Sequence, residues 1–196
     1  MKPSIRFDGF KDEWVTKHIG DVFKKESVKN SQLKYGPSKI ISLANLYYKN
    51  DPDNVPSDNY MKTYNEFKVG DIAFEGHINR NYKYGRFVAN KLGDGIVSHV
   101  FEVYTPKVTF DVNYLSEFIN YEPIMGRILR QTTKSATMMT SLVSSDFLKE
   151  AIQVPILPEQ QKIGQFFEKL DAEIAAEQAK IDWLKEQKKG LLQKVL

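Results

Sequence analysis

The segment 159–196 constrains the fold of this chain more than any other part of the sequence. It follows Pro158, contains neither proline nor a cluster of turn residues, and repeats apolar residues at steps that alternate between four and three. This spacing is the heptad seam of a helix that packs against another helix along one face. The seam residues are Ile163, Phe167, Leu170, Ile174, Ile181, Leu184, Leu191 and Val195. Two polar seam positions, Glu177 and Lys188, favour a specific pairing over a general one.

A helix over 159–196 would measure about 57 Å at 1.5 Å per residue. The residues before it would form a domain with a radius of gyration of about 15 Å, so the helix is too long to lie wholly against that domain. We therefore expect the apolar seam to pack against a second helix, and we predict a homodimer. The alternative is a long helix that folds back on its own domain.

Residues 1–154 are expected to form a mixed, strand-rich α+β domain. Short β-branched and aromatic stretches, separated by Gly, Asn, Asp and Pro, predict strands at 39–43, 69–75, 85–89, 95–98 and 100–104. Partly amphipathic segments predict helices at 10–25 and 111–130, and a short capped turn is expected at 145–148. Two prolines predict a stiff, extended linker over 155–158, ahead of the helix 159–196.

The composition limits the class of protein. Cysteine is absent, so disulfides and thiolate metal sites are not available. No run of about 18 apolar residues predicts a membrane span, and the first residues lack the apolar segment of a signal peptide. A cytoplasmic protein is the simplest interpretation. Acidic and basic residues are equal in number in 159–196, so the net charge of +3 comes from the preceding domain. That balance is compatible with a phosphate-binding face but does not establish one.

Searches for catalytic motifs give little. The segment Asn120-Tyr121-Glu122-Pro123 lacks the proline pair of an amino-methyltransferase motif, 93–98 is not a dinucleotide fingerprint, and no P-loop is present. Glu66-Phe67-Lys68, with Asp53 or Asp58 upstream, leaves a stand-alone Mg²⁺-dependent nuclease as an alternative. His18, His77 and His99 are isolated and have no metal-ligand spacing, so no metal site is predicted.

The junction between domain and helix carries a family resemblance. Pro155-Ile156-Leu157-Pro158-Glu159-Gln160-Gln161-Lys162-Ile163 resembles the P-x-L-x-E-Q-x-x-I junction of type I restriction–modification specificity subunits. The helix end at 188–193, the opening segment with Arg6-Phe7-Asp8-Gly9-Phe10, Trp14 and Ile19-Gly20-Asp21, and the strand at 70–74 are also similar to that family. Full-length members carry two target-recognition domains and two spacer helices, whereas this chain has one of each. The chain is therefore expected to be either a half-subunit or a fragment of a two-domain subunit, and we favour a half-subunit that self-associates.

The resemblance implies a non-catalytic, sequence-specific DNA-recognition subunit. In that family the specificity subunit docks methyltransferase subunits, which bind S-adenosylmethionine and methylate adenine, and restriction subunits, which use ATP and Mg²⁺. This chain is expected to bind no cofactor itself. As a homodimer it would read double-stranded DNA at an interrupted palindrome. A regulatory or decoy half-subunit, which occupies methyltransferase subunits without reading DNA, is the alternative.

The segment 77–86 is the first candidate for DNA contact. Its candidate residues are His77, Asn79, Arg80, Asn81, Lys83, Tyr84 and Arg86. Arginine can bind guanine O6 and N7, asparagine can bind adenine N6 and N7, and lysine and tyrosine suit phosphates. A solvated loop is the alternative interpretation of this composition.

Two further segments are candidates. The second segment spans 127–140 and supplies Arg127, Arg130, Gln131, Thr132, Thr133, Lys134, Ser135 and Thr137. Its hydroxyl groups and cations suit phosphates, and Gln131 suits adenine. The third segment supplies Lys34, Ser38 and Lys39 around Tyr35, and an ordinary surface loop explains it equally well.

Overall fold

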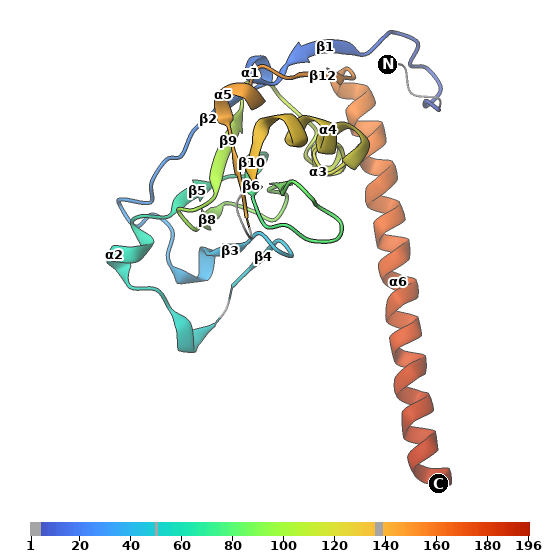
Figure 1. The fold of residues 1–196 in the computed structure, drawn as a ribbon. Helices are drawn as coiled ribbons and strands as arrows, with labels where there is room; N and C mark the ends of the chain where they lie inside the picture. Colours follow the sequence, from blue (N-terminus) through green and yellow to red (C-terminus); the bar gives the residue numbers. More distant parts are fainter. Residues whose placement is uncertain (1–4, 50, 136–138) are drawn as a thin grey trace.

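The computed structural model describes residues 5–49, 51–135 and 139–196 (Figure 1). An α+β domain carries a single long helix, α6 (Leu157–Val195), which projects away from it. The predicted α+β class with a long C-terminal helix is therefore confirmed. Among the described residues, no helix combines the length and the apolar character needed to cross a membrane.

A four-stranded antiparallel sheet forms the centre of the domain. Its strands run in the order β2 (Phe23–Lys25), β9 (Glu102–Pro106), β6 (Ile72–Glu75) and β7 (Arg86–Ala89). Residues alternate between the two faces, as the pleat of a strand requires. Ile72 and Phe74 enter one hydrophobic cluster, whereas Ala73 enters another. Both faces of the sheet are thus covered at β6 and β7, which explains why Ile72–Phe74 and Phe87–Ala89 are apolar without alternation.

Four two-stranded pairs surround this sheet. They are β1 (Val15–His18) with β12 (Ala151–Val154), β3 (Ile41–Ser42) with β4 (Tyr47–Tyr48), β5 (Asn65–Phe67) with β8 (Gly95–Val97), and β10 (Thr133–Ser135) with β11 (Thr140–Leu142). The shorter helices are α1 (Ile19–Val22), α2 (Asp58–Met61), α3 (Val112–Phe118), α4 (Glu122–Thr132) and α5 (Ser144–Phe147). Single 3-10 turns lie at η1 (Pro37–Lys39) and η2 (Pro52–Asn54).

Two of the predicted helices differ from the structure. The helix predicted at 10–25 is wrong, because β1, α1 and β2 occupy most of that segment. β1 pairs with β12, so a partner distant in sequence decides its conformation. The helix predicted at 111–130 is divided into α3 and α4, and Pro123 lies in the first turn of α4. Proline lacks a backbone N–H, so it is accepted at a helix start and not in its interior.

Helix α6 begins at Leu157, two residues earlier than predicted. Pro158 lies in its first turn, so the extended linker is shorter than the predicted 155–158. Two buried polar side chains fix this start. Glu159 accepts two hydrogen bonds from Arg6, at 2.8 and 2.7 Å. The Gln160 side chain accepts from the backbone N–H of Asp111 and donates to the carbonyl of Pro155. The base of α6 is therefore tied to both the N-terminal segment and α3.

Gly164 allows α3 and α6 to approach closely. A Cβ atom at this position would lie 2.1 Å from Oδ1 of Asp111 and 2.9 Å from the backbone nitrogen of Tyr114. Asp111 is also the N-cap of α3, where its carboxylate accepts from the Tyr114 N–H at 2.9 Å. The contact thus places the capped end of α3 directly against α6. Beyond this point the side chains of α6 are exposed.

Candidate nucleic-acid interface

The first candidate segment, 77–86, is the loop that joins β6 to β7. Oδ1 of Asn79 accepts hydrogen bonds from the backbone N–H groups of Asn81 and Tyr82, at 2.8 and 3.0 Å. This side chain therefore shapes the loop, as asparagine does in tight turns. His77, Arg80, Asn81 and Lys83 are exposed on the loop, whereas Tyr84 is partly buried against the main core.

Arg86 stands apart from the other candidates of this loop. Its guanidinium group donates to Glu75 at 2.8 Å and to the carbonyl oxygens of Leu43 and Ala44 at 3.1 and 2.8 Å. It also lies over the ring of Tyr82, 5.2 Å from the ring centre. These contacts engage the guanidinium group within the protein, so the structure places Arg86 at the base of the loop as a positioning residue.

The second candidate segment runs from the end of α4 into the β10–β11 hairpin. Arg130, Gln131 and Lys134 are exposed, whereas the hydroxyl of Thr133 donates to the carbonyl of Leu129 at 2.6 Å. Ser135 belongs to β10, and Thr137 lies outside the described residues.

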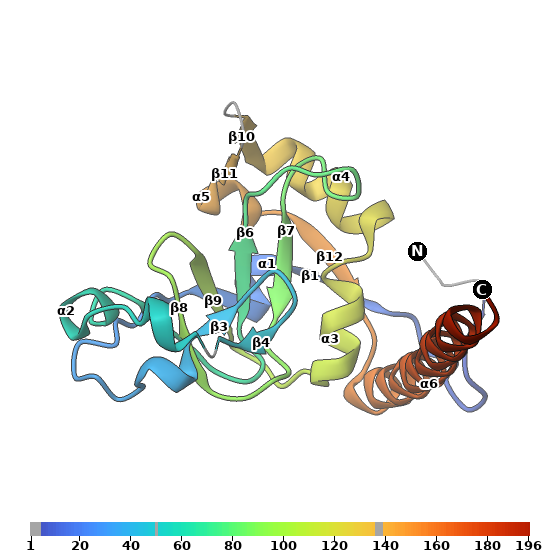
Figure 2. The same ribbon diagram turned by 90° about the horizontal axis from the view of Figure 1, so that it is seen from below.

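The structure brings these two segments together. The backbone N–H of Thr140 in β11 donates to the carbonyl of Gly76 at 2.7 Å, and its hydroxyl donates to the carbonyl of Tyr84 at 3.0 Å. His77 and Met139 form an antiparallel bridge beside these bonds. Gly76 is required here, because a Cβ atom would lie 2.0 Å from the carbonyl oxygen of Thr140. Figure 2 shows the β6–β7 loop and the β10–β11 hairpin at the same end of the domain.

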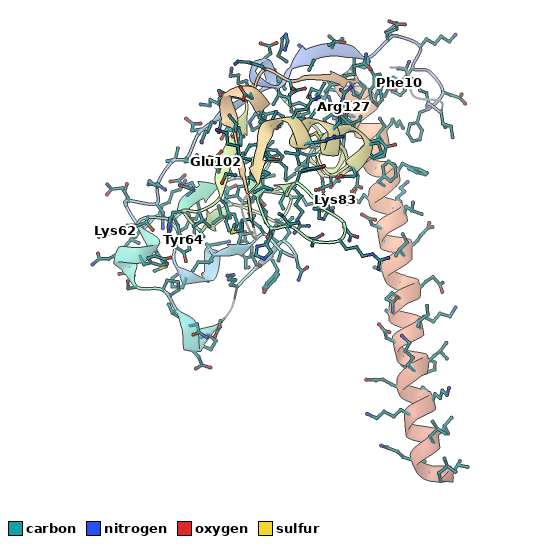
Figure 3. All side chains as sticks on the ribbon, in the orientation of Figure 1. Phe10, Lys62, Tyr64, Lys83, Glu102 and Arg127 are labelled. Atoms are coloured by element: carbon teal, nitrogen blue, oxygen red, sulfur yellow. The ribbon has the colours of Figure 1, made fainter. Side chains whose placement is uncertain are left out.

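We call the β6–β7 loop and the β10–β11 hairpin, together with the end of α4, the loop surface. Its exposed basic residues are Arg80, Lys83, Arg130 and Lys134. Within the described part of the chain, none of these four forms an ion pair. In Figure 3, Lys83 of this surface and Lys62, directly after α2, lie on different parts of the domain. The loop surface therefore presents exposed cations and amides on one end of the domain.

The third candidate segment lies elsewhere. Lys34 stacks over the ring of Tyr35 at 4.9 Å, and Lys39 over the ring of Tyr48 at 4.5 Å. Ser38 lies in η1, next to the bridge between Ile40 and Ile96 of β8. Figures 1 and 2 both place β3, β4 and β8 apart from β10. This segment is not part of the loop surface.

The residues considered for metal chemistry do not gather into a site. Glu66 lies in β5, and its carboxylate is 3.5 Å from the ammonium group of Lys68. In residues 5–49, 51–135 and 139–196, no three His, Asp or Glu side chains are placed to hold a metal ion. His18 bonds the carbonyl of Lys149 at 2.8 Å, and His99 packs against the ring of Tyr60.

Sequence reasoning missed a polar cluster at the start of β9. Glu102 accepts hydrogen bonds from the hydroxyls of Tyr104 and Ser144, both at 2.9 Å, and pairs with Lys25 at 2.7 Å. Burial opposes the charged form, but these partners hold the pKa of Glu102 below its ordinary value. Burial raises the pKa of Tyr104 well above its ordinary value, so this hydroxyl stays protonated as a donor. The cluster links β2, β9 and α5, and its role is structural.

Comparison with known proteins gives a consistent family. The family model for the type I restriction modification DNA specificity domain matches residues 11–186. The fold is similar to the HsdS subunit from Thermoanaerobacter tengcongensis, with a TM-score of 0.55 and 15% identity, over 86% of this chain and 45% of that chain. A chain from a study of complex assembly and conformational transition of the type I R-M system gives 0.54 and 13%, with the same coverage. This chain thus spans about half the length of those structures. No curated protein sequence matches it.

Proposed function

Since the chain belongs to the family of type I restriction modification DNA specificity domains, we propose that it recognises double-stranded DNA through the loop surface. The observation that carries this proposal is the joining of two cation-bearing segments by Thr140, Gly76 and Tyr84. Flexible loops lose conformational entropy when they bind. Two segments that are held together by hydrogen bonds are therefore better suited to keep a fixed geometry on a base sequence.

We assign roles by side-chain chemistry. Arg80 reads a guanine edge, and Asn81 and Gln131 read adenine edges, because these groups match the donors and acceptors of the major groove. Lys83, Arg130 and Lys134 bind phosphates, and His77 lies beside them. Phosphate contacts supply affinity for any DNA sequence. Asn79, Tyr84 and Arg86 hold the loop in shape. The third segment makes at most a peripheral phosphate contact through Lys34, Ser38 and Lys39.

A binding selection tests this function. The purified chain would be incubated with randomised duplex DNA, and the bound molecules would be sequenced. We expect one enriched sequence, and we expect Arg80→Ala to lose preference at one base pair of it. Lys62→Ala is the matched control, because Lys62 is an exposed cation directly after α2, and its loss should leave affinity and preference unchanged. Enrichment of no sequence would favour a decoy that occupies methyltransferase subunits without reading DNA.

We further propose that the chain has no catalytic role and acts in the cytoplasm with partner subunits. The methyltransferase partners would carry S-adenosylmethionine, and the restriction partners would use ATP and Mg²⁺. A cleavage assay with the chain alone and Mg²⁺ distinguishes a non-catalytic chain from a nuclease. We expect intact DNA, and Mg²⁺-dependent cleavage that is lost in Glu66→Gln would overturn the proposal.

Self-association through α6 completes the proposal. Leu170 is 40% exposed and Ile174 is 59% exposed, and Leu184, Leu191 and Val195 continue this exposed apolar face. An exposed apolar seam of this length is stabilised by a second helix. Two copies paired antiparallel place two equal domains at opposite ends. Light scattering should give a dimer at tens of micromolar protein, and Leu170→Asp with Ile174→Asp should give a monomer, because charges are costly in a dry seam.

A further inference from the structure

We propose that the α6 helices of two copies pair antiparallel in one register, which is set by ion pairs between Glu177 of each copy and Lys188 of the other. This inference rests on the proposed homodimer and names the contact that defines it. Glu177 and Lys188 are the two polar residues of the seam, and they carry opposite charges.

The register follows from the order of the seam positions. A step of four leads from a d position to the next a position, so Phe167, Ile174, Ile181, Lys188 and Val195 are a residues and the others are d residues. Reversing one helix reverses the order of the steps, so each a residue faces a d residue of the second copy. Because the two helices run in opposite directions, the two residue numbers in every facing pair add up to the same value within one register. Since each a residue must face a d residue, the allowed registers differ by one heptad.

One register pairs the polar residues with each other. In it Lys188 faces Glu177 of the second copy, Ile181 faces Leu184, Ile174 faces Leu191, and Val195 faces Leu170. Shifting the partner by one heptad in one direction sets Glu177 against Ile181 and Lys188 against Leu170. The opposite shift sets Glu177 against Val195 and Lys188 against Leu184. Both shifts bury a charge against an aliphatic side chain, which is unfavourable.

Residues beside the seam favour the same register. In antiparallel pairs the residues just before the a positions face one another, and here that row contains Glu173, Lys180 and Lys194. The proposed register brings Glu173 next to Lys194 of the second copy. The first shifted register instead brings Lys180 next to Lys180 of the second copy, at the two-fold axis. Opposite charges flanking a seam stabilise the pair, whereas like charges oppose it.

The structure accounts for the two seam residues that this register leaves out. Ile163 packs against the main core of its own domain, so it is already covered. Phe167 contacts Phe166, and Phe166 packs edge-on against Phe7 of the N-terminal segment at 5.8 Å. Glu177 has a partner at 3.7 Å, Lys180 of the same helix, but both side chains are about 70% exposed and such pairs are weak. Glu177 is therefore available to a second copy.

Charge reversal tests the register in the full-length chain. Glu177→Lys and Lys188→Glu should each weaken dimerisation at least tenfold in sedimentation equilibrium, because each creates two like-charge contacts in the seam. The double variant restores opposite charges and should return to within about threefold of the unmodified chain. Lys189→Glu is the matched control, since it makes the same change of charge one residue outside the seam. Loss of binding in the double variant, or equal effects of Lys188→Glu and Lys189→Glu, would overturn the register.

Cross-linking gives an independent measurement, because the sequence contains no cysteine. A copy with Ile174→Cys would be mixed with a copy carrying Leu191→Cys or Leu184→Cys and then oxidised. The proposed register predicts the 174–191 disulfide, and the first shifted register predicts the 174–184 disulfide. Predominance of the latter would overturn the register while leaving the dimer intact. A chain that stays monomeric without any substitution would instead refute the homodimer itself.

Discussion

Lys134 is an exposed cation of β10 on the loop surface, and its proposed role is to bind a phosphate. We expect Lys134→Ala to weaken binding to every sequence and to reduce the slope of log affinity against log salt by about one unit, as loss of one phosphate contact does. Arg80→Ala should instead cost about 1–3 kcal/mol at the preferred sequence only. Salt titrations on preferred and unrelated duplexes separate the two effects, and identical behaviour of both variants would contradict the assigned roles.

Glu102 gives a prediction for acid stability. Its pKa is lower in the folded chain than in the unfolded chain, so the unfolded state binds more protons at acidic pH. Its contribution is therefore present above the ordinary glutamate pKa and is lost as pH falls below it. Urea unfolding from pH 7 to pH 3.5 should show a shallower decline for Glu102→Gln than for the unmodified chain. Glu186→Gln, on the exposed part of α6, should decline like the unmodified chain.

Among the elements, the contact between α3 and α6 depends most clearly on one residue. Gly164→Ala would push a methyl group into the Asp111 cap, and overpacking of this kind costs about 1–3 kcal/mol. Gly190→Ala is the control in the same helix, because a Cβ atom there meets nothing within 4 Å. It should be neutral or slightly stabilising, since alanine favours helix more than glycine does. Thermal unfolding of both variants measures the difference, and equal melting temperatures would contradict the packing argument.

The elements also show what the sequence could predict. The strands around Ile72, Val88 and Val103 and the helix after Pro158 were predictable, because period and turn residues are local signals. β1 was not, because its pairing with β12 joins segments that are far apart in the sequence. The same holds for the loop surface. Composition identified both segments, but the bonds from Thr140 to Gly76 and Tyr84 join parts of the chain that only the fold brings together. Gly76 was the one local sequence signal of this contact, because only glycine fits against the carbonyl oxygen of Thr140.

For the whole molecule, symmetry predicts the form of the DNA site. Two identical copies related by a two-fold axis present one reading surface twice, so the site should contain the same half-site twice, inverted, with an unread gap. Inserting seven residues between Phe167 and Leu170 would lengthen each copy of α6 by about 10 Å. The insertions in the two copies add together. If the DNA runs along the helix pair, the gap should therefore grow by about six base pairs at 3.4 Å each, with unchanged half-sites. Sequencing of selected duplexes measures this, and two unrelated half-sites would show that the chain works beside a different domain.

The narrow attachment of α6 has a mechanical consequence. The helix has 39 residues and a length of about 58 Å, yet among the described residues it is held to the domain only through its first three turns. It therefore behaves as a lever with its fulcrum at Glu159, Gln160 and Gly164. A tilt of about 10° at that fulcrum would move the far end sideways by about 10 Å, but along the helix axis by only about 1 Å. The stiffness of one small buried junction therefore limits how far the two domains of the dimer can turn relative to one another, whereas the length of the helix sets their spacing.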